Sequence, residues 1–257
     1  MSTADKLLAV LPLFTMEQPE WTVEAAAEAL DVSGSTAYRY FNSLYRAGLL
    51  DPTSGGRYIL GPAIIAYDRQ LRLQDPLLQV ARPVMTRLVK RNGGDGVALL
   101  CRRFRQQVMC VHQAFEHKPA HAVSYERGRP MGLFRGSASV VILANLPARI
   151  LRTVWRDEHA DIAATGLGDS WDAFRGSLKK IRTAGVWITR GELDKGMIGI
   201  AAPIWQPDRQ IVGSIGIVVP EASTSPEEVA GTSALVQAAA REIDAGLLEA
   251  VRAEPAA

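Results

Sequence analysis

Residues 1–61 alternate short runs of apolar side chains at helical spacing with polar turn signals. Apolar residues recur every three or four positions between residues 7 and 14, and this spacing predicts a first helix. Thr22 is a suitable N-cap for a short second helix with Glu24 in its first turn. The inward face of this second helix is expected to hold Val23, Ala26, Ala27 and Leu30.

A third helix and a hairpin follow. The turn at residues 31–34 leads into a helix that we expect to run to residue 47 and to stop at Gly48, because glycine readily takes the conformation that closes a helix. Two short apolar runs then flank a Gly-rich tip at residues 54–56, a pattern typical of a β-hairpin. Three helices followed by a hairpin predict a winged helix-turn-helix over residues 1–61.

Residues 62–92 are predicted to form a helical linker, which carries a net charge of +4. A proline disfavours helix at the residue before it, and the linker contains Pro76 and Pro83. We therefore expect breaks near Asp75–Pro76 and Arg82–Pro83, and a hinge made of two or three helical pieces.

From residue 93 onward, short strands alternate with helices. Strands are expected at residues 97–102, 107–115, 120–125, 186–190, 197–205 and 210–219. Helices are expected at residues 137–145, 148–155, 171–184 and 226–251, the last opening on Ser225 as N-cap and Glu228 as the acid of a capping box. Hairpins mixed with helices indicate an antiparallel α+β domain over residues 93–257, not a βαβ nucleotide-binding fold.

Composition and charge narrow the class of protein. The chain has 257 residues, of which 47% are apolar and 22% charged, which suits one or two globular domains and argues against wholesale disorder. Two cysteines are too few for a disulfide scaffold. No apolar run approaches the roughly 18 residues of a membrane span, and the first residues lack signal-peptide features. We therefore expect a cytoplasmic protein without membrane contact.

The third helix divides into an apolar and a polar face. Ala37, Phe41 and Leu44 fall on one stripe when the helix is advanced by about 100° per residue. The polar face carries donors that suit phosphate or base contacts: Ser33, Ser35, Thr36, Tyr38, Arg39, Asn42 and Ser43. A solvated face explains the same pattern in an isolated helix, but the order of elements favours a helix that enters the major groove of DNA.

The charge of this region bears on how DNA is bound. Arg57, beside the tip of the hairpin, is the candidate for a minor-groove or backbone contact. Residues 1–61 nevertheless have a net charge of −3, although the whole chain has +2. So few cations in each copy imply weak binding by a monomer, which a dimer reading two half-sites would remedy.

Motifs in a fixed order run through nearly the whole chain. They are Ser-Gly-Ser-Thr-Ala-Tyr-Arg at 33–39, Ala-Gly-Leu-Leu at 47–50, Gly-Arg-Pro-Met-Gly-Leu-Phe-Arg-Gly-Ser-Ala-Ser at 128–139, Gly-Ile-Ala-Ala-Pro at 199–203 and Val-Gly-Ser-Ile-Gly at 212–216. In their order and spacing they resemble the IclR family of bacterial transcriptional regulators. The resemblance implies a homo-oligomeric regulator with a winged-helix domain, a linker that helps it dimerise and a GAF-like effector domain.

The resemblance also implies where an effector binds. In the family the pocket lies against the central sheet, beside the helix start after the Gly-Arg-Pro stretch and beside two late strands. Matched by position, the effector-binding residues are Met131, Leu133, Arg135, Gly136, Ser137, Ser139, Gly199, Ala201, Ser214, Gly216 and Val218.

The chemistry of these residues fits an organic acid. Ser137 and Ser139 are placed to hold a carboxylate at a helix start, with added charge from Arg135, although simple N-capping is their alternative role. Gly199 and Gly216 would let a ligand approach the sheet. Ser139-Val140 stands where many members have Gly-Lys, and Thr189 where an Asp is common. These departures favour a roomier, less polar pocket for an aromatic or longer acid.

The cysteine and histidine residues between positions 101 and 121 are weak evidence for a metal or catalytic site. Metal sites are usually built from closely spaced ligand pairs such as CxxC. No such pair occurs among Cys101, Cys110, His112, His117 and His121, so we expect no metal and no cofactor. Catalysis by Cys110 with His112 lacks an orienting acid, so no catalytic residues are assigned.

Two acidic groups remain. Residues 157–159 are interpreted as a solvated helix end. Glu192 and Asp194 resemble a paired carboxylate, but turn formation explains them.

The sequence therefore predicts a ligand-responsive transcriptional regulator, more readily a repressor than an activator, of catabolic or transport genes. Its partners would be double-stranded operator DNA, a small organic acid and further copies of itself in a dimer or tetramer. The main alternative is an enzyme that acts on a small acid and carries an appended DNA-binding module; a protein-interaction module is a third possibility.

Overall fold

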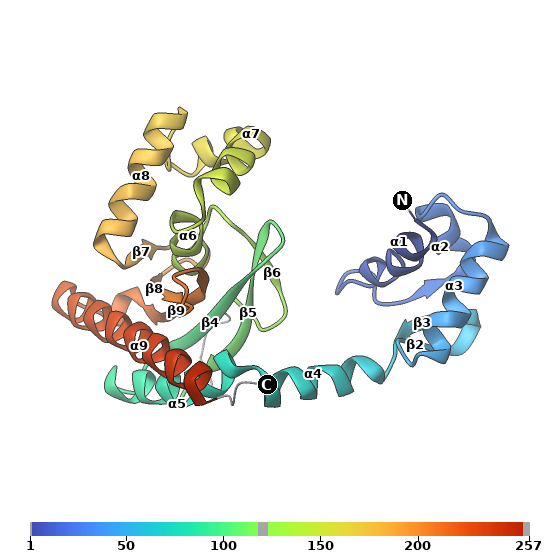
Figure 1. The fold of residues 1–257 in the computed structure, drawn as a ribbon, viewed down its shortest axis with the longest axis horizontal. Coiled ribbons are helices and arrows are strands. Elements are labelled where there is room, and N and C mark those ends of the chain that lie inside the picture. The colour runs from blue at the N-terminus through green and yellow to red at the C-terminus, as the bar shows by residue number, and fades with distance from the viewer. Residues whose placement is uncertain (1, 118–122, 254–257) are drawn as a thin grey trace. The chain divides into compact units, whose positions relative to one another are not determined.

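The computed structural model describes residues 2–117 and 123–253. The chain divides into two compact units, Met1–Asp75 and Pro76–Ala257 (Figure 1). The boundary falls within the predicted linker of residues 62–92, so the two helices of that linker belong to different units.

The first unit is the predicted winged helix-turn-helix. Its elements are α1 (Thr3–Leu8), the short 3-10 helix η1 (Leu11–Leu13), β1 (Trp21–Thr22), α2 (Val23–Ala29), α3 (Gly34–Arg46), β2 (Leu50–Pro52), the 3-10 turn η2 (Ser54–Gly56), β3 (Arg57–Leu60) and α4 (Ala63–Gln74). The predicted hairpin of β2 and β3 is confirmed, and β1 adds a third antiparallel strand in the order β1-β3-β2. This small sheet forms the wing.

Local signals fix the ends of these helices. The Thr22 hydroxyl accepts a hydrogen bond from the Ala25 N–H at the start of α2. Gly48 follows α3 with a φ of 70°, as predicted for the residue that closes the helix. Ala37, Phe41 and Leu44 are buried as predicted, and Tyr40 is buried with them. The core of this unit holds Val10, Ala26, Tyr40, Phe41, Leu44 and Leu50.

The linker breaks once. The predicted break at Asp75–Pro76 is confirmed, because α4 ends at Gln74 and α5 (Pro76–Arg91) begins at Pro76. The predicted break at Arg82–Pro83 is wrong, because α5 continues through Pro83. An interior proline costs a helix about 3 kcal/mol. Helix α5 buries seven side chains, and a fully buried large apolar side chain contributes about 1.5–3 kcal/mol, which outweighs that cost.

The second unit is built on one six-stranded antiparallel sheet in the order β6-β5-β4-β9-β8-β7. Its strands are β4 (Val97–Phe104), β5 (Gln107–Ala114), β6 (Pro130–Gly132), β7 (Trp187–Arg190), β8 (Met197–Trp205) and β9 (Ile211–Pro220). Its further helices are α6 (Ser137–Ala144), α7 (Ala148–Ala164), α8 (Trp171–Ala184), the 3-10 turn η3 (Glu221–Ser223) and α9 (Pro226–Ala253). The expected α+β fold is confirmed.

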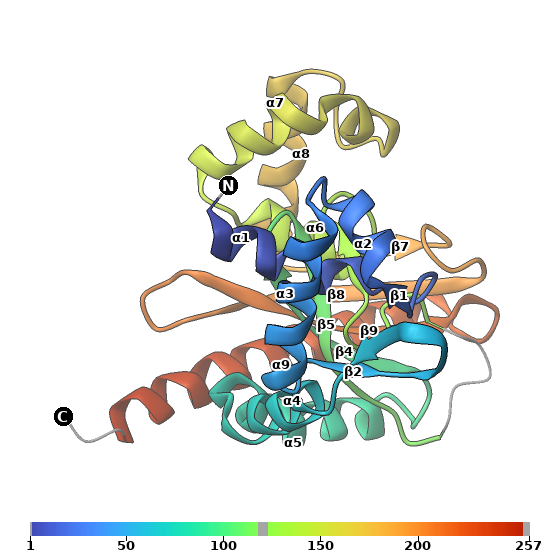
Figure 2. The ribbon, with the colours of Figure 1, turned by 90° about the vertical axis from the view of Figure 1, so that its right-hand side faces the viewer.

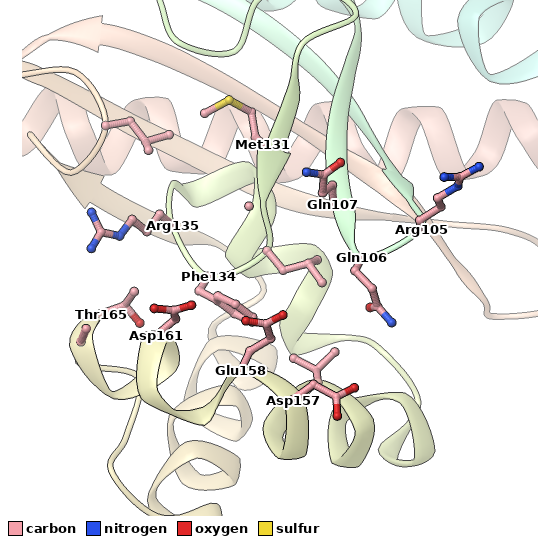
Figure 3. A pocket seen from close by; sticks show the side chains of 15 residues that line it. Arg105, Gln106, Gln107, Met131, Phe134, Arg135, Asp157, Glu158, Asp161 and Thr165 are labelled. Carbon is pink, nitrogen blue, oxygen red and sulfur yellow. The ribbon is translucent and has the colours of Figure 1, made fainter. Parts of the chain in front are cut away.

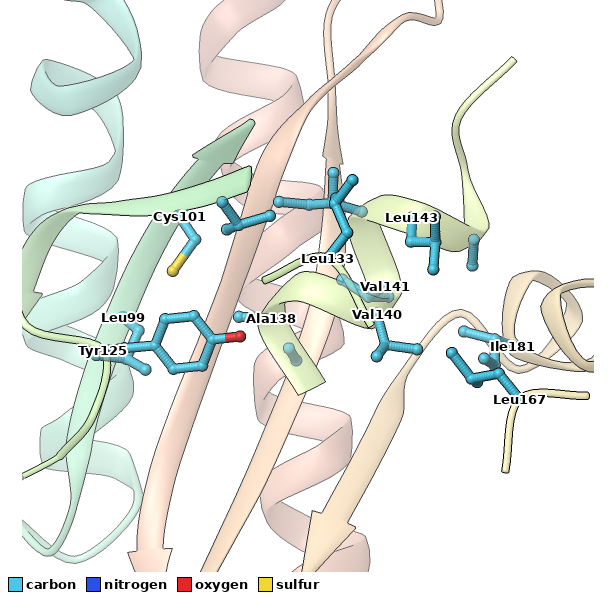
Figure 4. Packing of buried hydrophobic residues seen from close by; sticks show 14 of the residues in the cluster. Leu99, Cys101, Tyr125, Leu133, Ala138, Val140, Val141, Leu143, Leu167 and Ile181 are labelled. Atoms are coloured by element: carbon cyan, nitrogen blue, oxygen red, sulfur yellow. The ribbon is translucent and has the colours of Figure 1, made fainter. Parts of the chain in front are cut away.

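Both faces of this sheet are covered. Alternate residues of β4 point to opposite faces, so that Leu99 belongs to one apolar cluster and Leu100 to the other. Helices α6, α7 and α8 pack on the Leu99 face, part of which Figure 4 shows. Helices α5 and α9 lie side by side on the Leu100 face, as Figures 1 and 2 show. The predicted capping box at the start of α9 is present, with Ser225 and Glu228 bonded reciprocally.

Two expectations for this unit need correction. Of the strand predicted at residues 120–125, residues 120–122 lie outside the described part of the chain and residues 123–125 are not in a strand. Val123 and Tyr125 instead pack into the core, so their apolar pattern reports burial. Residues 157–159 are exposed as predicted and the helix is interrupted at Glu158, where φ is −132° and ψ is 20°, but α7 continues beyond this kink to Ala164. No helix within the described ranges is long and apolar enough to cross a membrane.

Candidate DNA-binding face and effector site

The polar face of α3 faces solvent. Ser33, Ser35, Tyr38, Arg39 and Ser43 are exposed. Thr36 and Asn42 are half-buried on the flanks of the same face. With Phe41 fully buried on the opposite side, the helix is anchored through its apolar stripe and leaves its donors free to contact a partner.

Hydroxyl groups gather at the N-terminus of α3. The Ser33 hydroxyl lies 2.8 Å from the Thr36 hydroxyl and 3.2 Å from the Ser35 hydroxyl, and it accepts a hydrogen bond from the Thr36 N–H. The helix dipole makes this end attractive to phosphate. Lys6 of α1 lines the same hollow as Ser33, Thr36 and Arg39. The sequence pattern did not single out Lys6 as a candidate for phosphate contact, because it lies 27 or more positions before Ser33, Thr36 and Arg39.

The wing carries Arg57 at the start of β3. Its side chain is exposed, but the guanidinium forms an ion pair with Glu20 at 3.1 Å. A phosphate approaching the wing therefore competes with this carboxylate for Arg57. Exposed ion pairs are worth at most about 1 kcal/mol, so the competition is weak.

The predicted effector residues of the late strands share one face of the sheet. The side chains of Ala201 and Val218 belong to the cluster that α6 covers. The alternation of β8 and β9 places Gly199, Ser214 and Gly216 on the same face. The strands therefore bring all five residues to the side of the sheet where α6 begins.

The glycines of this face differ in role. A Cβ atom at Gly216 would lie 2.8 Å from the Ile200 carbonyl oxygen, so this glycine is required by the neighbouring strand. A Cβ atom at Gly199 would lie 2.8 Å from the Ser137 Oγ and 3.0 Å from the Thr189 Oγ1. Of the two, Gly199 leaves room next to polar groups that face a pocket.

Ser139 and Ser214 are buried and fully engaged. The Ser139 N–H donates to the Tyr125 hydroxyl at 3.1 Å, and the Tyr125 O–H donates to the Ser139 hydroxyl at 2.7 Å. The Ser214 hydroxyl donates to the Ala138 carbonyl at 2.9 Å and so ties β9 to α6. Burial raises the pKa of the Tyr125 phenol, which keeps it a neutral donor. Ser139 therefore has a bonding role within the fold and does not cap α6.

The N-cap of α6 is Gly136, with no side-chain cap. A small inner pocket of about 20 Å³ lies beside it, which is room for one water molecule. The pocket is lined by Tyr125, Gly136, Ser137, Thr189, Glu192, Leu193, Asp194, Met197, Gly199 and Val218. The hydroxyl groups of Ser137 and Thr189 have no hydrogen bond to any described residue.

Glu192 and Asp194 hold this pocket together. The Gly136 N–H donates to a Glu192 carboxylate oxygen at 3.2 Å. Asp194 accepts from the Ser124 N–H at 3.0 Å and from the Ser124 hydroxyl at 2.5 Å. The predicted turn is present, because the Met197 N–H donates to the Asp194 carbonyl oxygen at 3.1 Å, but turn formation does not explain the two side chains. Both carboxylates bind segments that are far away in the chain.

A second, outer cavity of about 760 Å³ lies next to the inner pocket. The predicted residues Met131, Leu133 and Arg135 line it. Figure 3 shows Met131 and Arg135 together with Arg105 and Gln106 of the β4–β5 turn. Asp157, Glu158 and Asp161 of α7 form an acidic wall (Figure 3). Leu193 lines both the outer cavity and the inner pocket. The predicted effector residues are thus divided between two spaces and the core around them.

The structure describes both cysteines and shows how their thiols are bonded. Cys101 and Cys110 face each other across β4 and β5, and both thiols are free and buried. The hydrogen bond with Cys110, together with burial, raises the pKa of the Cys101 thiol. The Cys110 thiol donates to the His112 carbonyl oxygen, so the imidazole is not its partner. His121 lies outside the described residues, among which no three His, Cys, Asp or Glu are grouped to hold a metal.

The elements described above match two family models. The model described as the IclR helix-turn-helix domain matches residues 3–53. The model described as the C-terminal domain of the bacterial transcriptional regulator IclR matches residues 72–245, more than half of the chain. The chain belongs to the IclR family of bacterial transcriptional regulators. It is therefore a DNA-binding regulator with a ligand-binding C-terminal domain.

Individual relatives are similar over most of their length. The chain is 25% identical to the probable HTH-type transcriptional regulator ArcR of Halobacterium salinarum, over 88% of this chain and 86% of that protein. It is 23% identical to the HTH-type transcriptional regulator KipR of Bacillus subtilis, over 94% and 95% of the two chains.

Solved structures of the family share the fold. The IclR transcriptional regulator of Alicyclobacillus acidocaldarius has a TM-score of 0.76 at 19% identity, covering 95% of this chain and 98% of the other. An IclR homologue of Microbacterium hydrocarbonoxydans in complex with 4-hydroxybenzoate has a TM-score of 0.75 at 20% identity, covering 96% and 100%. Membership of a family of regulators overturns the alternative of an enzyme with an appended DNA-binding module.

Proposed function

We propose that this IclR-family regulator is a homo-oligomeric repressor of catabolic or transport genes whose effector is a small organic acid. Residues 1–61 bind operator DNA in the cytoplasm, where the chromosome lies. Residues 62–92 link and pair the subunits, and residues 93–257 bind the effector. Effector binding changes the spacing of the two DNA-binding domains and releases the operator.

The observation that carries the DNA-binding assignment is the exposed polar face of α3. Arg39 lies on the sixth residue of the helix, within about 9 Å of its first residue at 1.5 Å per residue. A major groove about 12 Å wide admits this half of the helix. The hydroxyls of Ser33 and Thr36 then meet the phosphates that flank the groove, while Arg39, Asn42 and Tyr38 reach base edges.

Helix α4 supports a dimer. None of its residues is buried in this chain. The large apolar side chains at least half exposed on it are those of Ile65, Tyr67, Leu71 and Leu73. Ile64, Tyr67 and Leu71 recur at intervals of three and four residues, which gives one apolar stripe along the helix. A second copy of α4 offers the same stripe and covers it in a twofold pair. Such a pair also supplies the two half-site contacts that one weakly charged domain needs.

The effector assignment rests on the start of α6. The first N–H groups of a helix lack partners within the helix and favour negative charge, and the unpartnered Ser137 hydroxyl lies beside them. Arg135 adds a positive charge on the wall of the outer cavity. A structural neighbour holds 4-hydroxybenzoate, an aromatic acid of the expected class.

The route between the sites runs through the hinge of the linker. Helix α4 ends at Gln74, Asp75 is extended, and α5 packs on the sheet face opposite the pocket. A shift of the sheet or of α5 therefore changes the direction of α4. An effector that binds one arrangement more tightly than the other shifts the population toward it.

A binding experiment tests the recognition assignment. The full-length protein selects its operator from a random DNA library, and the operator is then compared with random duplex DNA by gel shift at several salt concentrations. Arg39→Ala removes a base contact worth about 1–3 kcal/mol in each half-site, so the dimer loses roughly 30-fold to 10⁴-fold in affinity for the operator. Its affinity for random DNA changes far less.

The matched control is Arg46→Ala, which removes a guanidinium from the exposed last turn of the same helix. Because Arg46 lies outside the predicted base-reading set, this variant keeps the ratio of operator to random-DNA affinity. If Arg39→Ala preserves that ratio, α3 does not read bases through Arg39. Reporter expression that falls when the repressor gene is deleted would reverse the proposed sign of regulation.

A further inference from the structure

One side chain separates the inner pocket from the outer cavity. Leu193 is the only residue that lines both spaces among the described residues. A Cβ atom at Gly136 would lie 2.5 Å from the Leu193 Cδ1, so this methyl group rests against the N-cap of α6. The leucine therefore lies between a space of about 760 Å³ and one of about 20 Å³.

Leu193 lies on the loop of residues 191–196, which we call the strap. Residues 191–196 join β7 to β8, and the loop begins at Gly191 with a φ of 59° and ends at Gly196 with a φ of 72°. Glycines adopt such angles without strain and serve as hinges. Between them, Glu192 is bonded to Gly136 and Asp194 to Ser124, so polar contacts at two points hold the strap down.

Glu192 occupies the position that suits an effector carboxylate. Its carboxylate accepts the Gly136 N–H at the positive end of α6. The inner pocket has two carboxylates, of Glu192 and Asp194, and no cationic side chain among its lining residues. A second anion placed beside Glu192 would meet like charge in a confined space.

The pocket nevertheless has features of a ligand site. Ser137 is 94% buried, its hydroxyl faces the pocket, and it has no hydrogen bond to any residue that the structure describes. The hydroxyl of Thr189, on β7, lines the same pocket from a half-buried side chain. Buried hydroxyls ordinarily have a hydrogen-bond partner, and a carboxylate in the pocket would supply one to Ser137. The volume of one water molecule, however, leaves no room for an organic acid.

We propose that residues 191–196 form a gate, closed in this structure, and that Glu192 is an internal stand-in for the effector. An organic acid enters through the outer cavity and displaces Leu193. Its carboxylate then replaces that of Glu192 at the start of α6, against Ser137 and Thr189, while its body remains in the space joined to the outer cavity. This inference rests on the proposed organic-acid effector.

The gate explains how a cavity with an acidic wall can select an anion. The two carboxylates of the strap leave with it, so the opened pocket loses the charges of Glu192 and Asp194 and keeps the positive end of α6. Neutral molecules gain less from that exchange, because they do not replace the lost charge at the helix start. The strap therefore favours acids over their uncharged analogues.

The test compares an acid with its amide. Isothermal titration calorimetry of the full-length protein measures 4-hydroxybenzoate against 4-hydroxybenzamide, and pyruvate against pyruvamide. Glu192→Gln keeps a hydrogen-bond acceptor for Gly136 but removes the competing charge. A charge at a helix terminus contributes about 0.3–2 kcal/mol, so the acid-to-amide affinity ratio is expected to rise roughly 2-fold to 30-fold.

Two further variants keep the result specific. Glu249→Gln removes an exposed carboxylate from α9, on the sheet face opposite both spaces, and is expected to leave the ratio unchanged. Leu193→Ala joins the two spaces and is expected to raise the association rate of the acid in stopped-flow experiments. Unfolding of either strap variant is checked by its melting temperature.

The outcomes separate the inference from the proposed function. If acids bind and the ratio is the same in the wild type and Glu192→Gln, the displacement of Glu192 is overturned while the organic-acid effector stands. An equal rise in Glu249→Gln also overturns it, because the effect would then be a general loss of negative charge. An unchanged association rate in Leu193→Ala overturns the gate. If neither acid binds any variant, the proposed effector class fails, and the inference fails with it.

Discussion

Phe41 is expected to hold α3, the proposed DNA-recognition helix, in its place in the first unit. Its side chain is fully buried in the small core of the first unit. Its ring stands edge-on to Tyr58 of the wing, with ring centroids 5.0 Å apart and an interplanar angle of 79°. The same side chain therefore anchors α3 and holds β3 against it. Phe41→Ala removes both contacts and leaves a cavity between the helix and the wing.

The magnitude follows from the burial and from the size of the unit. Truncating a buried phenylalanine to alanine costs about 3–5 kcal/mol. A unit that ends at Asp75 is stabilised by only about 4–11 kcal/mol, at roughly 0.05–0.15 kcal/mol per residue. The substitution therefore removes a large part of the stability of the first unit. The second unit has two apolar clusters of its own and is expected to stay folded.

Hydrogen exchange with mass spectrometry measures both units in one sample. In Phe41→Ala, amide protection of peptides from α3 is expected to fall roughly 10²-fold to 10⁴-fold, while peptides from β8 and β9 keep theirs. The control is Tyr45→Ala on the same helix, where the side chain is 47% exposed and the loss should stay within about 1 kcal/mol. Equal protection in the two variants would refute the anchoring role of Phe41, and loosening of β8 would refute the independence of the two cores.

Two further predictions concern oligomerisation and pH. Leu71→Glu on α4 should weaken the dimer by roughly 10²-fold or more in sedimentation experiments, because each of the two paired helices then places a charge in the apolar stripe. The control is Gln70→Glu at the neighbouring exposed residue, which should leave the dimer affinity unchanged. A stable Leu71→Glu dimer would exclude this interface. Burial raises the pKa of Asp244 to about 6, although its carboxylate accepts the Trp205 N–H. The folded state then binds the proton more tightly than the unfolded state, so the free energy of unfolding should fall as pH rises from about 4 to about 6, by about 1 kcal/mol after allowance for partial exposure. Asp244→Asn should lack this component in urea titrations, and identical pH profiles for the two proteins would contradict it.

The elements with strong local signals were predictable from the sequence. The apolar stripe of α3, the Ser33 cap and Gly48 together fix where that helix lies and which face it buries. The predicted bounds of α8 and β8 agree with the structure because helical periodicity and alternation persist over their full length. Motif order also identified the family, which the family models confirm.

Other features depend on neighbours that the local pattern cannot reveal. Pro83 sits inside α5 because packing against the sheet and α9 outweighs the cost of a proline. Residues 123–125 have strand-like side chains, but their burial in the core does not need a strand partner. Ser139 and Ser214 fit an effector site by position, yet the fold engages both in hydrogen bonds within the core.

The sequence by itself determined the order of the elements and the two faces of α3, because each of these follows from neighbours a few positions apart. Only the tertiary structure decided which residues line the inner pocket. Glu192 reaches Gly136 across 56 positions and Asp194 reaches Ser124 across 70, and Leu193 between them lines both the inner pocket and the outer cavity. Such contacts are set by how the sheet, α6 and the loop pack together, and no periodicity in the chain encodes that arrangement.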